Sequence, residues 1–258
     1  MQQTQEILLA FYGDDFTGST DALEFLSRAG AKTVLFLDNP SQELLSQFHD
    51  LDAIGIAGMT RSMAPNEMTK TLNESFESLQ QFNVRHVHYK VCSTFDSSPE
   101  IGNIGTAIQV GKTVFKNKFT PVLVAAPNLG RYSAFGHLYA RMGIGSQGAI
   151  HRLDRHPSMS KHPITPADES DLRLHLSKQI QQPMGLIDLV DLGKSREEIK
   201  AKLTTEVASG NSIIFFDAMY ENQMQIIGEL IDGCVAEDKP LFSIGSSGIE
   251  VSNNSLFS

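Results

Sequence analysis

The sequence predicts an α/β fold with a doubly wound, mainly parallel sheet, flanking helices and an irregular excursion around residues 128–166. Short apolar runs alternate with segments of helical periodicity, which is the pattern of βαβ units. The chain has 258 residues, of which 41% are hydrophobic. This length suffices to bury a large core in one domain with a lobe or in two small lobes, and we expect the former.

Eight apolar runs are predicted to be strands, because each is short, rich in β-branched or aromatic residues and bounded by turn-forming residues. They are residues 7–12, 32–37, 51–58, 84–91, 121–127, 185–192, 212–218 and 240–245. Apolar residues at helical spacing predict helices between them, around residues 22–29, 68–79, 105–113, 170–180, 199–207 and 223–235. Residues 128–166 show no consistent period, so we expect them to cross one end of the sheet.

Composition excludes several classes of partner. The formal charge of −9 argues against a nucleic-acid-binding protein, since phosphate-backbone affinity needs clustered Lys and Arg. No stretch of about 18 apolar residues could span a membrane. Cys92 and Cys234 form no CxxC pair, so we expect no disulfide framework, no metal site and a reducing, cytoplasmic setting. A homo-oligomer is compatible with this composition.

Two adjacent acids, Asp14 and Asp15, directly follow the first predicted strand. Ligands of open parallel sheets gather at the carboxyl ends of the strands. Adjacent carboxylates there can orient a hydroxyl, accept its proton or hold Mg²⁺. The alternative is helix capping, in which Thr17, Ser19 or Thr20 would cap the helix that follows. Capping by these hydroxyls leaves both acids unexplained, so we favour a functional role for at least one of them.

Polar residues also follow other predicted strands. The segment YKVCSTFDSSPEIGNIG, residues 89–105, places hydroxyls, an acid and an amide in one turn before a helix. Such a turn suits an anionic or polyhydroxyl ligand, or it is an ordinary turn in which Ser97 or Ser98 caps the helix. Arginines at strand ends suit carboxylate recognition, although solvated arginines are commoner. The candidates from these segments are Arg61, Ser93, Asp96, Asn103 and Arg131.

The excursion contributes His162 and Thr165 from KHPITP, residues 161–166. Its histidines do not match a zinc-binding spacing. Near the end of the chain, Gly245, Ser246, Ser247 and Gly248 form a turn of the kind that approaches ligands closely.

Taken in order, these motifs resemble the N-terminal domain of the four-carbon acid sugar kinase family, which includes threonate, erythronate and 3-oxo-tetronate kinases. The resemblance rests on GDDFTGSTD, TRSM, YKVCSTFDSSPEIGNIG, PNLGRYSAFGHLY, KHPITPADESDL and IGSSGIE, which cover nearly the whole chain.

The resemblance implies ATP-dependent phosphorylation of the terminal hydroxyl of a four-carbon sugar acid, with Mg²⁺ and ATP as cofactors that this chain alone would not bind. Asp14, Asp15 and Thr17 would then surround the reacting hydroxyl, with Asp15 favoured as general base. The substrate carboxylate and hydroxyls would be held by Arg61, Ser93, Asp96, Asn103 and Arg131, and the site would be lined by His162 and Thr165.

Departures from the family pattern bear on the substrate. Gly13, Thr60, Tyr132 and Ala167 stand where the family commonly has Ala, Ser, Thr and Met. Tyr132 is the largest change, because it places a ring beside an expected carboxylate ligand.

We expect residues 1–258 to form the sugar-acid-binding domain, with the ATP-binding domain absent and Gly245–Gly248 near the hinge into it. One half of a phosphoryl-transfer clamp would be inactive unless a separate nucleotide-binding domain joined it. Two alternatives stay open. The chain could be a non-catalytic binding or interaction protein, or a Mg²⁺-dependent phosphatase, although phosphatases of the haloacid-dehalogenase type have Asp-x-Asp where this chain has adjacent acids.

Overall fold

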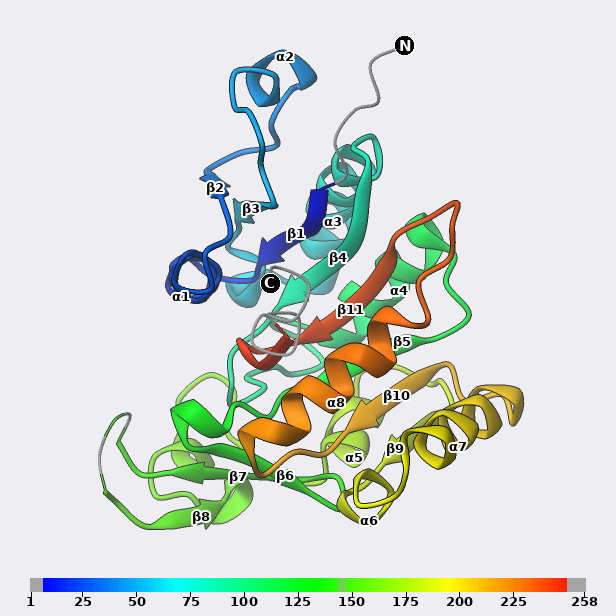
Figure 1. Ribbon diagram of the computed structural model, residues 1–258. Coiled ribbons are helices and arrows are strands. Elements are labelled where there is room, and N and C mark those ends of the chain that lie inside the picture. Colours follow the sequence, from blue (N-terminus) through cyan, green and yellow to red (C-terminus); the bar gives the residue numbers. More distant parts are fainter. Residues whose placement is uncertain (1–6, 144, 146, 250–258) are drawn as a thin grey trace.

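An eight-stranded, all-parallel sheet forms the centre of the computed structural model, which describes residues 7–143, 145 and 147–249 (Figure 1). The strand order is β2-β3-β1-β4-β11-β5-β10-β9. The eight predicted apolar runs each contribute a strand to this sheet, which confirms the predicted α/β class. The strands are β1 (Ile7–Gly13), β2 (Thr33–Phe36), β3 (Ala53–Ala57), β4 (Val84–Lys90), β5 (Thr120–Leu123), β9 (Met184–Ile187), β10 (Ile213–Phe216) and β11 (Leu241–Gly245).

Helices cover both faces of the sheet because its central strands are apolar on both sides. In β1, Leu9 and Phe11 pack against α1, whereas Ala10 and Tyr12 face the opposite layer, where α3 and α4 lie. Residues of α7 and α8 pack on the same face as α1. The helices are α1 (Phe16–Arg28), α2 (Gln42–Leu45), α3 (Pro65–Gln80), α4 (Ile104–Phe115), α5 (Leu172–Ser177), α6 (Leu189–Leu192), α7 (Arg196–Ala208) and α8 (Glu221–Asp232).

None of the helices within the described residues is both long and apolar enough to cross a membrane. The short helix α2 was not predicted from the sequence.

The run 185–192 is not one strand, as the sequence pattern predicted. It divides at Asp188, whose side chain accepts a hydrogen bond from the backbone N–H of Asp191, 2.9 Å away. Asp188 therefore caps α6, and the apolar residues after it are helical. A local cap thus outweighs the apolar run that suggested a longer strand.

The excursion crosses the carboxyl edge of the sheet, as expected, but it contains a small antiparallel sheet of β6, β7 and β8 that the sequence pattern did not reveal. The backbone N–H of Ser133 in β6 donates to the carbonyl of Ala218, which follows β10 (2.9 Å). This bond ties the small sheet to the large one. The elements of the excursion are η2 (Pro127–Leu129), β6 (Arg131–Ala134), β7 (His137–Arg141), β8 (Ile150–Arg152), η3 (Leu153–Arg155) and η4 (Met159–Lys161).

A cluster of aromatic rings holds α3 and α4 against the sheet. Phe76 of α3 is fully buried and lies 5.2 Å from Phe242 and 5.6 Å from Phe115, measured between ring centroids. Its ring also meets Tyr12 and Tyr89 edge-on, at 6.2 Å in both cases. Tyr12 and Tyr89 lie near the carboxyl ends of β1 and β4, so this cluster helps to fix the strand ends that carry the site.

We predict that Phe76→Ala lowers the free energy of unfolding by about 3–5 kcal/mol, because it leaves a cavity among four rings. Denaturant unfolding followed by circular dichroism measures the change. Glu77→Ala, at the exposed neighbouring position, is the control and should stay within about 0.5 kcal/mol of wild type. A loss below about 1 kcal/mol for Phe76→Ala would contradict the assigned packing.

Candidate functional site

A cleft of about 700 Å³ lies at the carboxyl ends of β1, β3 and β4, with one wall supplied by the excursion. This is the edge at which open parallel sheets bind their ligands. The described residues that line it are Asp14, Asp15, Phe16, Thr17, Met59, Arg61, Ser62, Asp96, Ile101, His162, Ile164 and Thr165.

The side chain of Arg61 joins the two acids of the GDDFTG motif. Its Nε and Nη2 donate to the two oxygens of Asp14, at 3.0 and 2.6 Å, and its Nη1 donates to Asp15 Oδ2 at 2.5 Å. The backbone N–H of Arg61 also donates to the carbonyl of Asp14, at 2.9 Å. Asp14 is 2% exposed, so the guanidinium compensates an otherwise isolated buried charge.

Asp15 is the N-cap of α1. Its Oδ1 accepts a hydrogen bond from the backbone N–H of Gly18 at 2.6 Å. The alternative in which Thr17, Ser19 or Thr20 caps this helix was wrong, because the helix already begins at Phe16 and Asp15 is its cap. Ser19 instead donates its hydroxyl back to the carbonyl of Asp15, at 2.6 Å.

Burial raises the pKa of the Asp14 carboxyl to about 6, and the hydrogen bonds and charge of Arg61 limit that rise. Both carboxylate oxygens accept hydrogen bonds from the guanidinium. The geometry thus makes Asp14 a group that orients Arg61. Three of the five guanidinium N–H donors are engaged by carboxylates, which leaves two for other partners.

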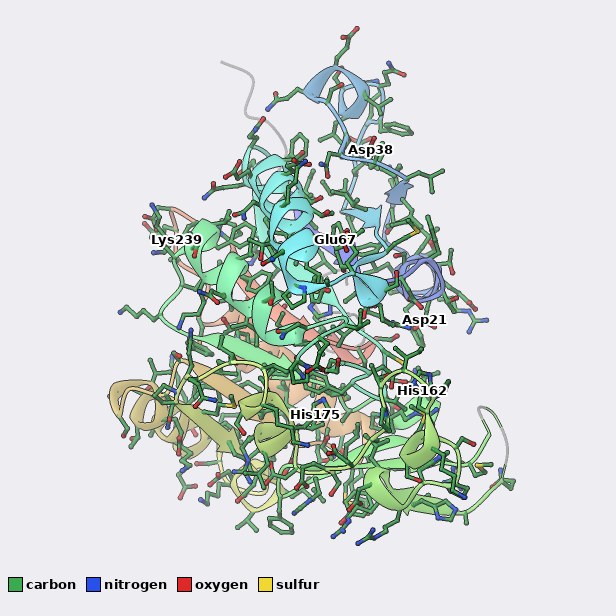
Figure 2. The ribbon with its side chains drawn as sticks, turned by 180° about the vertical axis from the view of Figure 1, so that it is seen from behind. Asp21, Asp38, Glu67, His162, His175 and Lys239 are labelled. Atoms are coloured by element: carbon green, nitrogen blue, oxygen red, sulfur yellow. The ribbon has the colours of Figure 1, made fainter. Side chains whose placement is uncertain are left out.

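Four further predicted residues line the same cleft: Thr17, Asp96, His162 and Thr165. Figure 2 labels His162 and His175 in the half of the molecule that holds the excursion and α5. His162 Nδ1 accepts a hydrogen bond from the backbone N–H of Thr165 at 3.0 Å and lies 2.9 Å from its hydroxyl. Since Nδ1 is the acceptor, Nε2 carries the proton of the neutral ring and is the donor available to a ligand.

Three predicted residues are not among the described residues that line the cleft: Ser93, Asn103 and Arg131. Asn103 caps α4, accepting from the backbone N–H of Thr106 at 2.7 Å, so neither Ser97 nor Ser98 caps it as the alternative supposed.

Arg131 is 7% exposed, and its Nη1 donates to the backbone carbonyls of Leu129, Gly130 and Arg141 at 3.1–3.4 Å. Tyr132 accepts a hydrogen bond from the Arg141 side chain at 3.3 Å and is likewise absent from the lining.

The turn after β11 packs against the sheet. Cβ atoms at Gly245 and Gly248 would lie 2.1 and 2.0 Å from carbonyl oxygens at the end of β5, so close strand packing requires these glycines. The Ser246 hydroxyl donates to a carbonyl at 2.7 Å, and the Ser247 hydroxyl donates to Asp21. These contacts pack the turn against the sheet and α1, and Glu250 of the IGSSGIE motif lies outside the described residues.

Sequence reasoning missed a buried charge beside the cleft. Lys90, the last residue of β4, is 2% exposed, and its Nζ lies 3.6 Å from Asp21 Oδ2 of α1. A Cβ at Gly18 would lie 3.4 Å from this ammonium and 3.8 Å from Arg61 Nη2, so both cations approach the first turn of α1. The position of Lys90 at the end of a largely buried central strand is the sequence feature that could have revealed this buried charge.

In the described part of the chain, no three His, Cys, Asp or Glu side chains are grouped as ligands for a metal ion. Asp14 and Asp15, the acids considered for Mg²⁺, are bound to Arg61 instead.

The chain matches a known family and several known proteins over nearly its whole length. A family model described as a sugar-binding N-terminal domain matches residues 9–252. The chain is 40% identical over 245 residues to a 3-oxo-isoapionate kinase of Paraburkholderia graminis, covering 95% of this chain and 50% of that protein. It is 31% identical over 233 residues to a 3-oxo-tetronate kinase of Salmonella typhimurium, covering 90% of this chain and 51% of the relative.

A solved structure has the same fold. The DUF1537 protein HI1011 of Haemophilus influenzae superposes with a TM-score of 0.82 at 25% identity, covering 96% of this chain and 55% of that one. The chain thus spans about half the length of the relatives it matches.

We predict that Arg61→Met destabilises the fold by about 3 kcal/mol at pH 8 and by less at pH 5. Without the guanidinium, the folded-state pKa of Asp14 rises beyond about 6, above its unfolded value near 4. A carboxyl with a raised folded pKa stabilises the fold most at low pH, and this contribution is lost as pH rises through the folded pKa.

Denaturant unfolding at the two pH values measures the difference. Arg28→Met removes an exposed arginine from α1 and should change stability little at either pH. Equal losses at pH 5 and pH 8 for Arg61→Met would contradict the proposed compensation of Asp14.

Proposed function

This chain belongs to the family of sugar-binding N-terminal domains, and we propose that it binds the sugar-acid substrate of an ATP-dependent kinase of the 3-oxo-tetronate or 3-oxo-isoapionate kind. The ligand lies in the cleft at the ends of β1, β3 and β4, and its terminal hydroxyl is the group that receives phosphate.

The mixed character of the cleft is the observation that carries this proposal. It combines carboxylates, hydroxyls, an imidazole and a guanidinium with the apolar side chains of Phe16, Met59 and Ile164. Closely spaced groups that can donate and accept hydrogen bonds match a polyhydroxy acid, whereas an apolar ligand would leave them without partners. The two remaining N–H donors of Arg61 and the Nε2 donor of His162 can hold the ligand carboxylate.

Phosphorylation requires a nucleotide-binding region beyond the described residues, in the same or a separate polypeptide. Phosphoryl transfer depends on positioning the γ-phosphate and Mg²⁺ against the acceptor hydroxyl. The two glycines of the turn at Gly245–Gly248 pack closely against the end of β5. We therefore propose that this domain binds the sugar acid without transferring phosphate by itself.

The alternatives have less support. A Mg²⁺-dependent phosphatase would need acids free to bind the metal, but Asp14 and Asp15 are paired with Arg61. A non-catalytic interaction protein would not need the charge compensation and open donors of the cleft. Affinity for a sugar acid separates the first proposal from both.

We predict that D-threonate, D-erythronate or 3-oxo-tetronate stabilises the purified chain, whether or not Mg-ATP is present. A ligand that binds only the folded state raises the free energy of unfolding by about 2.7 kcal/mol at a hundredfold excess over its Kd. Thermal shift followed by titration calorimetry measures the effect.

Succinate, a four-carbon acid without hydroxyls, is the control ligand. An intact fold that binds none of the sugar acids would contradict the proposed function and favour an interaction protein. Phosphate release from an aryl phosphate would favour the phosphatase.

A further inference from the structure

The cleft is lined by three carboxylates, and two of them are committed to internal contacts. Both oxygens of Asp14 accept hydrogen bonds from Arg61. In Asp15, Oδ1 accepts a hydrogen bond from the backbone N–H of Gly18, and Oδ2 accepts one from Arg61. Each of these four oxygens already has a donor, and charge-assisted hydrogen bonds make a carboxylate less basic toward a ligand hydroxyl.

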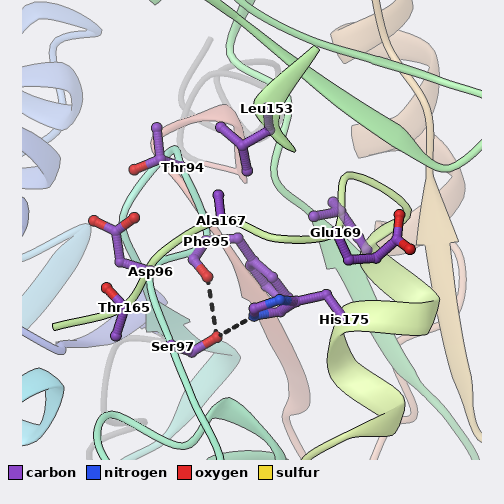
Figure 3. A pocket seen from close by; sticks show the side chains of 10 residues that line it. Thr94, Phe95, Asp96, Ser97, Leu153, Thr165, Ala167, Glu169 and His175 are labelled. Carbon is purple, nitrogen blue, oxygen red and sulfur yellow. Dashed lines mark hydrogen bonds between the residues drawn. The ribbon is translucent and has the colours of Figure 1, made fainter. Parts of the chain in front are cut away.

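The third carboxylate, Asp96, makes no hydrogen bond or ion pair with any other described residue. It is half-buried and lines the cleft. Figure 3 shows its carboxylate pointing away from the Ser97–His175 pair beside it. The buried guanidinium of Arg131 interacts with it electrostatically.

Both neighbours of Asp96 in the chain are anchored. Phe95 is 1% exposed, packs against His175 and Phe215, and adopts a left-handed backbone conformation with φ of 56°. Ser97 is 3% exposed, lies 2.9 Å from His175 Nε2 and accepts a hydrogen bond from Gln179 at 2.9 Å.

A bulky residue held at positive φ is strained, and such strained residues cluster at functional sites. The core thus fixes the backbone on each side of Asp96. The carboxylate itself is left without an internal partner.

We propose, on the basis of the proposed function, that Asp96 binds the acceptor hydroxyl of the sugar acid and takes its proton. As the hydroxyl oxygen bonds to the terminal phosphorus of a nucleoside triphosphate, the O–H proton passes to Asp96. The bond from that phosphorus to the bridging oxygen breaks, and the nucleoside diphosphate leaves. This role differs from the initial expectation, which favoured Asp15.

The test is a binding cycle on the whole chain. Wild type and Asp96→Ala are titrated with D-threonate and D-erythronate, and with the 2,3-dihydroxybutanoates of matching configuration, which lack only the C4 hydroxyl. Wild type should lose roughly tenfold or more in affinity when this hydroxyl is absent. Asp96→Ala should bind both members of a pair alike, because the partner of the hydroxyl is gone.

Glu100→Gln is the matched control, since Glu100 lies in the same loop but is exposed and outside the cleft lining. It should discriminate between the ligands as wild type does. Thermal melting of each variant establishes that it is folded, and Asp96→Asn gives a second variant of nearly unchanged size.

The outcomes separate the two proposals. If wild type binds none of D-threonate, D-erythronate and 3-oxo-tetronate, the proposed function fails, and this inference fails with it. If wild type binds a sugar acid but Asp96→Ala and Asp96→Asn still discriminate tenfold against the ligand without the hydroxyl, Asp96 does not bind that hydroxyl. The inference is then overturned while the proposed function stands.

Discussion

The ion pairs between Arg61 and the two acids at the end of β1 are the interaction on which the site depends. Arg61 lies in η1 (Thr60–Ser62) after β3, and Asp15 begins α1, so one guanidinium joins two strand ends and a helix N-terminus. Asp14 is buried and would be costly without this partner. The same contacts that stabilise the fold therefore determine which polar groups of the cleft stay open to a ligand.

The cleft has two walls with different roles. On one, every carboxylate oxygen of Asp14 and Asp15 accepts a hydrogen bond from Arg61 or from the first turn of α1. On the other, Asp96 and the Nε2 of His162 keep their hydrogen-bonding capacity. A polyhydroxy acid between them would meet a preorganised guanidinium with two free N–H donors and an open acceptor, an arrangement that lowers the reorganisation needed on binding.

The excursion completes the cleft because the main sheet anchors it. Its small antiparallel sheet is joined to the segment after β10 through Ser133 and Ala218. The backbone N–H of Leu172 in α5 donates to the carbonyl of Gly136, at 3.0 Å, and this bond links the hairpin of β6 and β7 to α5. His162 and Thr165 thus reach the ends of β1 and β3 from a segment far along the chain, on an ordered support.

The sequence by itself determined the parallel α/β sheet, since apolar runs and helical periods are local properties. It also located the cleft, because acids and hydroxyls gather after strands whose carboxyl ends share one edge. Only the tertiary structure decided which of those groups pair with each other and which stay open to a ligand. Arg61 is 47 residues from Asp14, and no local pattern reveals that they pair, that Asn103 and Arg131 are used within the fold, or that Asp96 is left open. Charge compensation depends on distances in space, which the order of residues does not state.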